Sequence, residues 1–347
     1  GHFDLVFCTS QNHCESAPAY IFSAPFDSAE PQELPVRGAM TGIAADLTGD
    51  GYDDLIIAAK YDGRDVDLNA VVYYGSEEGY SERRMNYLPA PWATSLAAGD
   101  FTGTGRPSLA FVCRGQVRIF YSGELGIEAR RWVEPGIAAL QVAAGDLDGD
   151  GHAELIVRDA EGRTLIYWGG PEGIAPGRFT PLELLVPKAA DLEAELRKQS
   201  DFERTEEPEP RLAVLRWRGR TCLSVITPEK VYFFACDGDR RFQPVLTLDA
   251  PLAQAVAVGD LSGNGREDIF VAARTPDAAD KKREYSWFFP LADGGDYPEK
   301  RAIATWRAYD CAIADFRGDG TRQLAVCQSH TPTSFTSEAL LFAEVGA

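Results

Sequence analysis

One acidic, glycine-rich segment recurs along most of this chain, and this repetition constrains the fold more than any other feature. The copy that begins "GDLDGDGHAEL" at Gly145 has acids and glycines at fixed positions before a short apolar run. The five clear copies occupy residues 44–59, 98–113, 144–159, 258–273 and 313–328. A sixth copy at 214–226 keeps the hydrophobic frame and Gly219 but lacks the acids. Self-similarity of this kind indicates a fold assembled from repeated supersecondary units.

The spacing of the copies predicts the type of unit. Their loops begin at residues 46, 100, 146, 214, 260 and 315, and steps of this length suit a four-stranded blade of a β-propeller. Residues 3–9 match the second half of the repeat at 53–59 and so add a seventh unit. Residues 338–345 read as a third strand with no fourth. We therefore predict an all-β, seven-bladed β-propeller whose first and last blades are incomplete.

The composition of each unit supports this prediction. The segment before each loop is rich in Ala and Gly, the segment after it is a short apolar run, and the next segment carries aromatic residues. These are strand patterns bounded by Gly and Pro, and helical periodicity is nearly absent. The exception is residues 188–199, which are followed by a polar, proline-containing linker. We expect one propeller domain over residues 1–347, with a helical, charged insertion at about 188–210 between blades four and five.

The acidic loops have the chemistry of a cation site. An EF-hand needs flanking helices and a Glu at position twelve, whereas here strands flank the loop and its last acid is at position nine. Calcium prefers six to eight oxygen ligands at about 2.3–2.6 Å. Side chains at positions one, three, five and nine and the carbonyl of position seven can supply such oxygens. Glycines at positions four and six allow the backbone to turn this tightly.

We rank the loops as calcium sites by the number of carboxylates that each contains. The loop at 146 is the best predicted calcium site, with ligands Asp146, Asp148, Asp150, the His152 carbonyl and Glu154. The loop at 46 is the second site, with ligands Asp46, Thr48, Asp50, the Tyr52 carbonyl and Asp54. The loop at 260 is a possible, weaker third site, with ligands Asp260, Ser262, Asn264, the Arg266 carbonyl and Asp268. The remaining loops lack enough acids.

A metal-free alternative stays open for all of these loops. The first Asp of each loop can accept hydrogen bonds from turn N–H groups without an ion. Asp100 and Asp315 retain this acid in loops that we do not expect to bind calcium, which favours a capping role. In either case the loop is expected to stabilise a hairpin rather than to catalyse a reaction.

The repeated motif D-x-[DNS]-x-D-G-x-x-[DE] resembles that of the FG-GAP/VCBS repeat family, which includes the propellers of integrin α-subunits. The resemblance covers nearly the whole chain and is specific because the motif recurs at blade spacing. It implies an extracellular propeller stabilised by Ca²⁺, and it does not imply one activity.

Charge and hydropathy narrow the possible partners. The net charge is -19, from 53 acidic and 34 basic residues, so we expect no binding to nucleic acid. No run of about 18 apolar residues occurs, so we expect no membrane insertion. No signal peptide is visible, and Gly1 and His2 are not assigned to the fold. The expected location is extracellular or periplasmic.

The seven cysteines leave two interpretations open. Three local disulfides are possible, with Cys113 left over: Cys8–Cys14, Cys222–Cys236 and Cys311–Cys327. The alternative is that these residues are reduced thiols, buried in the fold.

Long connections predict a ligand-binding face opposite the calcium loops. Blades one, two, six and seven have long segments at 9–18, 60–69, 274–284 and 328–337. Loops on a rigid scaffold commonly carry binding residues. The candidate ligand-binding residues are Arg37, Tyr61, Trp92, Arg274, Trp306, Tyr309 and His330. The alternative is that the long loops are tolerated insertions and that Trp92 and Trp306 pack between blades.

We expect this face to bind a glycan or an extracellular protein. The second hypothesis is a polysaccharide lyase or another carbohydrate-active enzyme on the same face, because a lyase needs a base and cations beside the substrate carboxylate. The weak candidates for these catalytic roles are His13, Arg274, Arg307, Tyr309 and His330. A binding protein is favoured over an enzyme.

Overall fold

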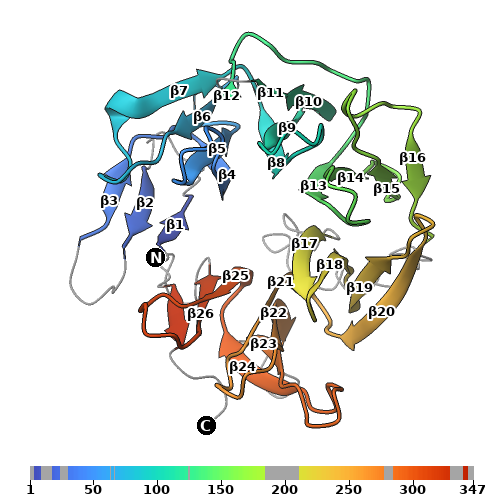
Figure 1. The fold of residues 1–347 in the computed structure, drawn as a ribbon. Coiled ribbons are helices and arrows are strands. Elements are labelled where there is room, and N and C mark those ends of the chain that lie inside the picture. The colour runs from blue at the N-terminus through green and yellow to red at the C-terminus, as the bar shows by residue number, and fades with distance from the viewer. Residues whose placement is uncertain are drawn as a thin grey trace. The chain divides into compact units, whose positions relative to one another are not determined.

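The computed structural model describes residues 4–8, 18–23, 30–62, 64–65, 67–123, 126–183, 211–276, 284–328 and 339–342. Within these ranges the regular secondary structure is almost entirely β-strand, and the one helical element is the 3-10 turn η1 (Glu82–Arg84). The strands form seven antiparallel meanders in chain order, each of three or four strands (Figure 1). The all-β, seven-bladed β-propeller predicted from the repeat is therefore confirmed.

The first of two compact units contains blades one to four, together with the later segments Cys236–Arg241 and Phe316–Asp319. The strands of blades one and two are β1 (Leu5–Phe7), β2 (Ala19–Phe22), β3 (Gln32–Leu34), β4 (Ala39–Ala45), β5 (Asp54–Ala59), β6 (Ala70–Tyr73) and β7 (Met85–Leu88). Those of blade three are β8 (Ala93–Gly99), β9 (Ser108–Cys113) and β10 (Gln116–Phe120), followed by a small hairpin of β11 (Ser122–Gly123) and β12 (Gly126–Ile127). Those of blade four are β13 (Gln141–Gly145), β14 (Glu154–Arg158), β15 (Thr164–Tyr167) and β16 (Phe179–Pro181).

The second unit contains blades five to seven. The strands of blade five are β17 (Arg211–Trp217), β18 (Arg220–Ile226), β19 (Lys230–Cys236) and β20 (Phe242–Asp249). Those of blade six are β21 (Ala253–Gly259), β22 (Asp268–Pro276), β23 (Glu284–Phe289) and β24 (Arg301–Thr305). Those of blade seven are β25 (Ala308–Ala314), β26 (Gln323–Gln328) and β27 (Leu340–Phe342). In the described residues the first and last blades thus have three strands each, in agreement with the prediction that they are incomplete. The predicted helical insertion at 188–210 lies outside the described residues.

Small residues in the first strand of each blade allow neighbouring blades to approach closely. A Cβ atom on Gly99 of β8 would lie 2.8 Å from the Cβ of Ala153 and 3.0 Å from that of Ala144 on β13. In the second unit, a Cβ atom on Gly259 of β21 would clash with the side chain of Ile313 on β25. The abundance of Ala and Gly before each loop is therefore a packing requirement.

The hydrophobic core lies between successive blades of each unit. Every residue of β5 and β9 is buried, so both faces of these second strands are covered. One cluster joins Ile56 of blade two to Leu96 and Phe111 of blade three, and another joins Val112 of blade three to Leu155 of blade four. This arrangement explains why the second strands read as continuous apolar runs rather than alternating ones.

Two of the three disulfides considered from the sequence do not form. Cys113, Cys222, Cys236, Cys311 and Cys327 carry free thiols, whereas Cys14 lies outside the described residues. Leu223 pairs with Phe234 and Asp310 pairs with Cys327, so each proposed pair is offset by one residue in its hairpin. An offset of one residue places two side chains on opposite faces of a sheet. The hairpins were predicted well, but their register excludes the bonds Cys222–Cys236 and Cys311–Cys327.

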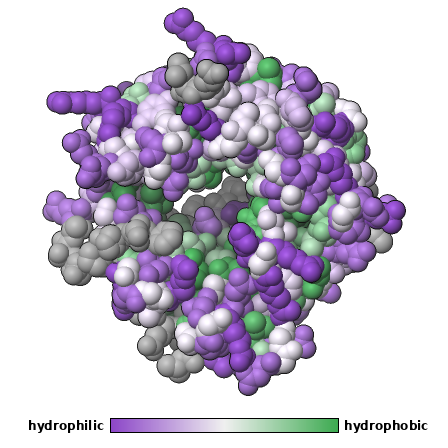
Figure 2. Space-filling view, viewed as in Figure 1, coloured by the Kyte–Doolittle hydropathy of each residue, from purple (hydrophilic) through white to green (hydrophobic). Residues whose placement is uncertain are grey.

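The surface is mostly hydrophilic on the side that Figure 2 shows. Hydrophilic residues cover most of the face drawn in Figure 2, and hydrophobic residues form smaller areas between them. No helix in the described part of the chain is both long and apolar enough to cross a lipid bilayer.

The close approach of β8 and β13 gives a test of the packing. We expect Gly99→Ala to destabilise the protein by about 1–3 kcal/mol, because the added methyl group overlaps Ala153 and Ala144. Gly177→Ala is the matched control, since nothing lies within 4 Å of its added Cβ atom. Urea unfolding of both variants measures the effect. Equal stability of the two variants would mean that β8 and β13 are not packed as described.

Candidate metal centre

The acidic loops all close the hairpin between the first and second strands of a blade. In five blades the residue before the loop pairs with the residue at loop position nine, in one shared register. These pairs are Ala45 with Asp54, Gly99 with Ser108, Gly145 with Glu154, Gly259 with Asp268 and Ala314 with Gln323. Strands rather than helices flank each loop, so the predicted hairpin is confirmed.

The first acid of each loop accepts hydrogen bonds from the turn that follows it. Asp46 Oδ1 accepts from the N–H groups of Gly49 at 2.6 Å and Asp50 at 3.2 Å, and its Oδ2 accepts from Gly51 at 2.9 Å. Equivalent bonds are made by Asp100, Asp146, Asp260 and Asp315. The capping role inferred for this acid is therefore confirmed, including in loops that lack the other acids.

In blades two and six the ninth loop residue is a buried carboxylate that is hydrogen-bonded to two separate backbone segments. Asp54 Oδ2 accepts from Leu47 N at 3.0 Å, and its Oδ1 accepts from Gly75 N, just beyond β6, at 2.9 Å. Asp268 likewise accepts from Leu261 N and from Leu291 N beyond β23. Burial raises the pKa of Asp54, and the donors Gly75 and Leu47 act in the opposite direction. Both oxygens of these two carboxylates are thus bonded to the backbone.

Glu154, whose side chain is one methylene longer, does not follow this pattern. Its Oε2 accepts from Leu147 N at 2.7 Å, but its Oε1 is buried and has no hydrogen-bond partner. The residue is fully buried. Burial first, and then the nearby charges of Asp148, Asp146 and Asp150, raise the pKa of Glu154 to about 8. An unpartnered buried carboxylate oxygen is costly unless a cation or a proton compensates for it.

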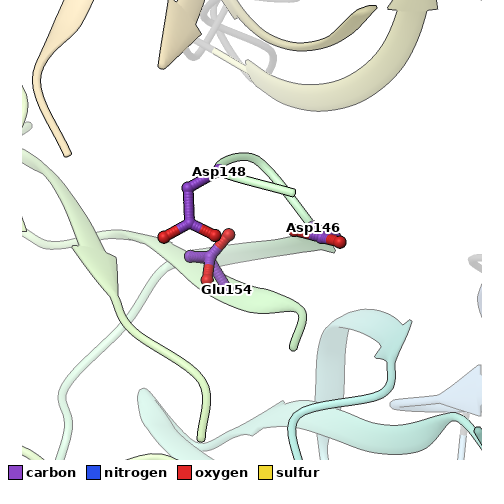
Figure 3. Close-up of side chains that lie close together, drawn as sticks. All are labelled: Asp146, Asp148 and Glu154. Carbon is purple, nitrogen blue, oxygen red and sulfur yellow. The ribbon is translucent and has the colours of Figure 1, made fainter. Parts of the chain in front are cut away.

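The carboxylates of Asp146 and Asp148 lie close to that of Glu154. Ligand atoms of Asp146, Asp148 and Glu154 all lie within 4.8 Å of one another, and Figure 3 shows the carboxylates of Asp148 and Glu154 turned toward each other. This is the one set of three or more His, Cys, Asp or Glu residues so grouped in the part of the chain that the structure describes. Its donors are all carboxylate oxygens, which suits a hard cation such as Ca²⁺.

Two other predicted ligands of this loop lie at its exposed side. Asp150 Oδ1 accepts from His152 N at 2.8 Å and lies 3.1 Å from His152 Nδ1. Its Oδ2 accepts a hydrogen bond from Arg240 of blade five. Asp150 is therefore engaged on both oxygens, and Asp146, Asp148 and Glu154 form the centre of the candidate site.

The loops at 46 and 260 do not gather their acids in this way. Asp50 Oδ1 accepts from Tyr52 N, and Thr48 Oγ1 lies 3.4 Å from Asp46 Oδ1. At the other loop, Asn264 Oδ1 accepts from Arg266 N at 2.9 Å, and Ser262 N donates to Asp268 Oδ2 at 2.8 Å. As in the blade-four loop, a cation in either loop would share oxygens that already accept backbone hydrogen bonds. Metal binding at these two loops stays a prediction.

Candidate ligand residues in the first unit have local structural partners. The Arg37 guanidinium pairs with Asp62 and with Asp65. Tyr61 is exposed. Trp92 has a positive φ of 56° directly before β8, and Lys60 Nζ lies 5.0 Å from its ring centroid. Trp92 therefore serves the turn into blade three, whatever else it contacts.

In the second unit the structure brings two of the candidates together. The Arg274 guanidinium lies 5.7 Å from the ring centroid of Tyr309. Trp306 N donates to Gln328 Oε1 at 2.6 Å, while Arg307 has a φ of 41° and its N–H donates to Glu284 Oε2. Arg307 thus occupies the turn before β25, as Trp92 does before β8. His13 and His330 lie outside the described residues.

One residue at the candidate metal centre was missed by sequence reasoning. Arg240, in the turn between β19 and β20, donates from Nε to Asp148 Oδ2 and from Nη2 to Asp150 Oδ2, each at 2.9 Å. The sequence indicates a turn at 236–241, which is confirmed, but the partners of Arg240 are 92 and 90 residues away. No local pattern in the sequence indicates that contact.

Comparison with known proteins supports the fold alone. No family model matches the chain, and no curated protein matches it in sequence. The periplasmic gluconolactonase PpgL of Pseudomonas aeruginosa has a similar structure, with a TM-score of 0.58 and 14% identity over 99% of this chain and 97% of that one. BBS1N, crystallised with ARL6DN, gives a TM-score of 0.57 and 10% identity over 94% and 85%. A functionally unknown protein from Desulfotomaculum acetoxidans DSM 771 gives 0.50 and 13% over 94% and 86%. The structural similarity identifies the class, a seven-bladed β-propeller. Sequence identities this low indicate no particular activity.

The raised pKa of Glu154 predicts a pH effect on the ion-free protein. The folded state holds this proton more tightly than the unfolded state, so stability should fall as pH rises from about 4.5 to about 8. Glu154→Gln removes the titrating group and should flatten this decline. Urea unfolding across that window, with a chelator present, measures it.

The control for this test is Asp100→Asn, which changes a loop acid outside the cluster. It should retain the decline of stability between about pH 4.5 and 8 that Glu154→Gln loses. Parallel pH profiles for Glu154→Gln and Asp100→Asn would show that Glu154 is not the group responsible.

Proposed function

We propose that this protein is a calcium-stabilised binding module in which Ca²⁺ holds the blade-four hairpin. The observation that carries the proposal is the buried carboxylate of Glu154, whose Oε1 has no hydrogen-bond partner and which is grouped with the carboxylates of Asp146 and Asp148. A divalent cation would neutralise charges that the fold otherwise holds close together at a cost. The residues fit the ion because they offer several hard oxygen donors in one place.

The residues that would hold the ion are Asp146, Asp148 and Glu154, with Asp150 and the His152 carbonyl completing the set on sequence grounds. The bound ion supplies positive charge that fixes the loop, and the role is structural. We propose weaker sites at the loops beginning at 46 and 260. Their ninth residues, Asp54 and Asp268, already accept backbone hydrogen bonds on both oxygens.

The proposed location is extracellular or periplasmic. Calcium sites of extracellular modules have dissociation constants on the order of 10⁻⁴–10⁻³ M, which suits a calcium-rich exterior. A loop that depends on calcium for neutralisation of its acids fits such a compartment. The net charge of -19 also favours a cation-rich medium, because cations screen the repulsion between surface acids.

We propose that the ligand, a glycan or a protein, binds on the face opposite the calcium loops. The contact between Arg274 and Tyr309 supports this choice, because a cation beside an aromatic ring suits recognition of polar ligands. Similar propellers occur in a gluconolactonase and in BBS1N bound to ARL6DN, so the fold is compatible with an enzyme or a protein-binding module. Binding is favoured over catalysis because Arg307, one of the weak catalytic candidates, has a positive φ and a structural role in the turn before β25.

Calcium titration tests the proposal. At a free concentration about ten times the dissociation constant, Ca²⁺ should add about 1.4 kcal/mol to the stability of the folded state. Thermal unfolding with increasing Ca²⁺, together with isothermal titration calorimetry, measures this. Glu154→Gln should weaken binding by roughly tenfold or more, because it removes a buried charge facing the ion.

The matched control is again Asp100→Asn, in a hairpin that keeps the capping acid but lacks the other ligands. It should lower stability without changing calcium affinity. The proposal fails if Ca²⁺ leaves the unfolding temperature of the parent protein unchanged. It fails equally if Glu154→Gln binds calcium as tightly as Asp100→Asn does.

A further inference from the structure

Arg240 places a positive charge directly on the carboxylates of the candidate metal centre. Its Nε and Nη2 atoms each lie 2.9 Å from an oxygen, one on Asp148 and one on Asp150. The side chain of Asp148 is 9% exposed and that of Arg240 is 39% exposed, so the guanidinium lies at the solvent side of the cluster. The fork of an arginine matches this two-carboxylate arrangement well.

The position of the guanidinium is imposed by its surroundings. Its central carbon lies 4.4 Å from the ring centroid of Trp168, which is almost fully buried. The turn that carries it is closed by Asp237, whose Oδ1 accepts from the N–H groups of Asp239 and Arg241 at 3.0 Å each. Arg240 itself has a φ of 60°, a conformation that a non-glycine residue rarely adopts without compensation. These contacts stabilise a side chain that is directed at the loop.

Arg240 does not replace a metal ion completely. Four carboxylates surround this point, those of Asp146, Asp148, Asp150 and Glu154, against one guanidinium. Arg240 contacts only Asp148 and Asp150, and Glu154 Oε1 stays without a partner. The centre therefore still lacks positive charge, while a second cation would experience repulsion from the guanidinium and would compete for Asp148 and Asp150.

We propose that Arg240 is an internal competitor of the calcium ion, which holds the loop when no ion is bound and lowers the affinity of the site. This inference rests on the proposed calcium site. Calcium binding draws Asp148 and Asp150 away from the guanidinium and so weakens the hold on the turn between β19 and β20. The site thus couples its ion content to the mobility of the segment Cys236–Arg241, which belongs to the same compact unit as the loop.

The test compares Arg240→Gln with Arg241→Gln, a neighbouring substitution with the same change in net charge. Calorimetric titration with CaCl₂ should show binding roughly threefold to tenfold tighter in Arg240→Gln than in Arg241→Gln, as expected from the loss of two partly exposed ion pairs. In the presence of a chelator, Arg240→Gln should unfold at a lower temperature than Arg241→Gln. Affinity that is equal to or weaker than that of the control overturns the proposal.

Hydrogen exchange of the unaltered protein gives a second readout that needs no variant. The amides of residues 236–241 should exchange faster with Ca²⁺ than with chelator, while those of the blade-four loop should exchange more slowly. Unchanged or slower exchange at 236–241 overturns the competition. Failure of Ca²⁺ to bind either the parent protein or Arg240→Gln refutes the calcium site itself, whereas equal binding by both refutes only the role of Arg240.

Discussion

In three of the five acidic hairpins, a hydrogen bond from the second loop residue to a buried carboxylate at position nine closes the loop. It joins the start of the loop to the start of the next strand, at 3.0 Å for Asp54, 2.7 Å for Glu154 and 3.1 Å for Asp268. A carboxylate in this place is buried, so its second oxygen also needs a partner. Backbone N–H groups beyond the third strand supply that partner in blades two and six.

Blade four satisfies the same requirement differently. Its ninth residue has a backbone donor for one oxygen only, and the carboxylate is grouped with those of Asp146 and Asp148, so positive charge or a proton must compensate for the second oxygen. Arg240 supplies part of it from blade five, and a bound ion is proposed to supply the rest. The function that we propose therefore depends on charge compensation at one hairpin, since propellers of this class serve unrelated activities.

Much of the fold could be predicted from the sequence because its determinants are local and repeated. The hairpins, the small residues facing the next blade and the capping acid all follow from patterns within one repeat. The arginine at the metal centre could not be predicted, since Arg240 and Asp148 are 92 residues apart. The possible disulfides Cys222–Cys236 and Cys311–Cys327 were wrong because the two cysteines of each pair are offset by one residue across the hairpin. The spacing of cysteines in the sequence does not define that register. Trp92 is a predicted ligand residue and Arg307 a weak catalytic candidate, and their positive φ angles, which the sequence does not show, place them in the turns before β8 and β25.

The difference between Asp54 and Glu154 has a consequence for how such chains diverge. Both residues begin the second strand in the same register, and both accept the hydrogen bond from the second loop residue. The shorter Asp54 has backbone donors for both of its oxygens, whereas the longer Glu154 leaves one oxygen available for a metal ion. On the calcium site that we propose, dependence on the ionic composition of the medium would therefore be set blade by blade, through the side chain at this one position.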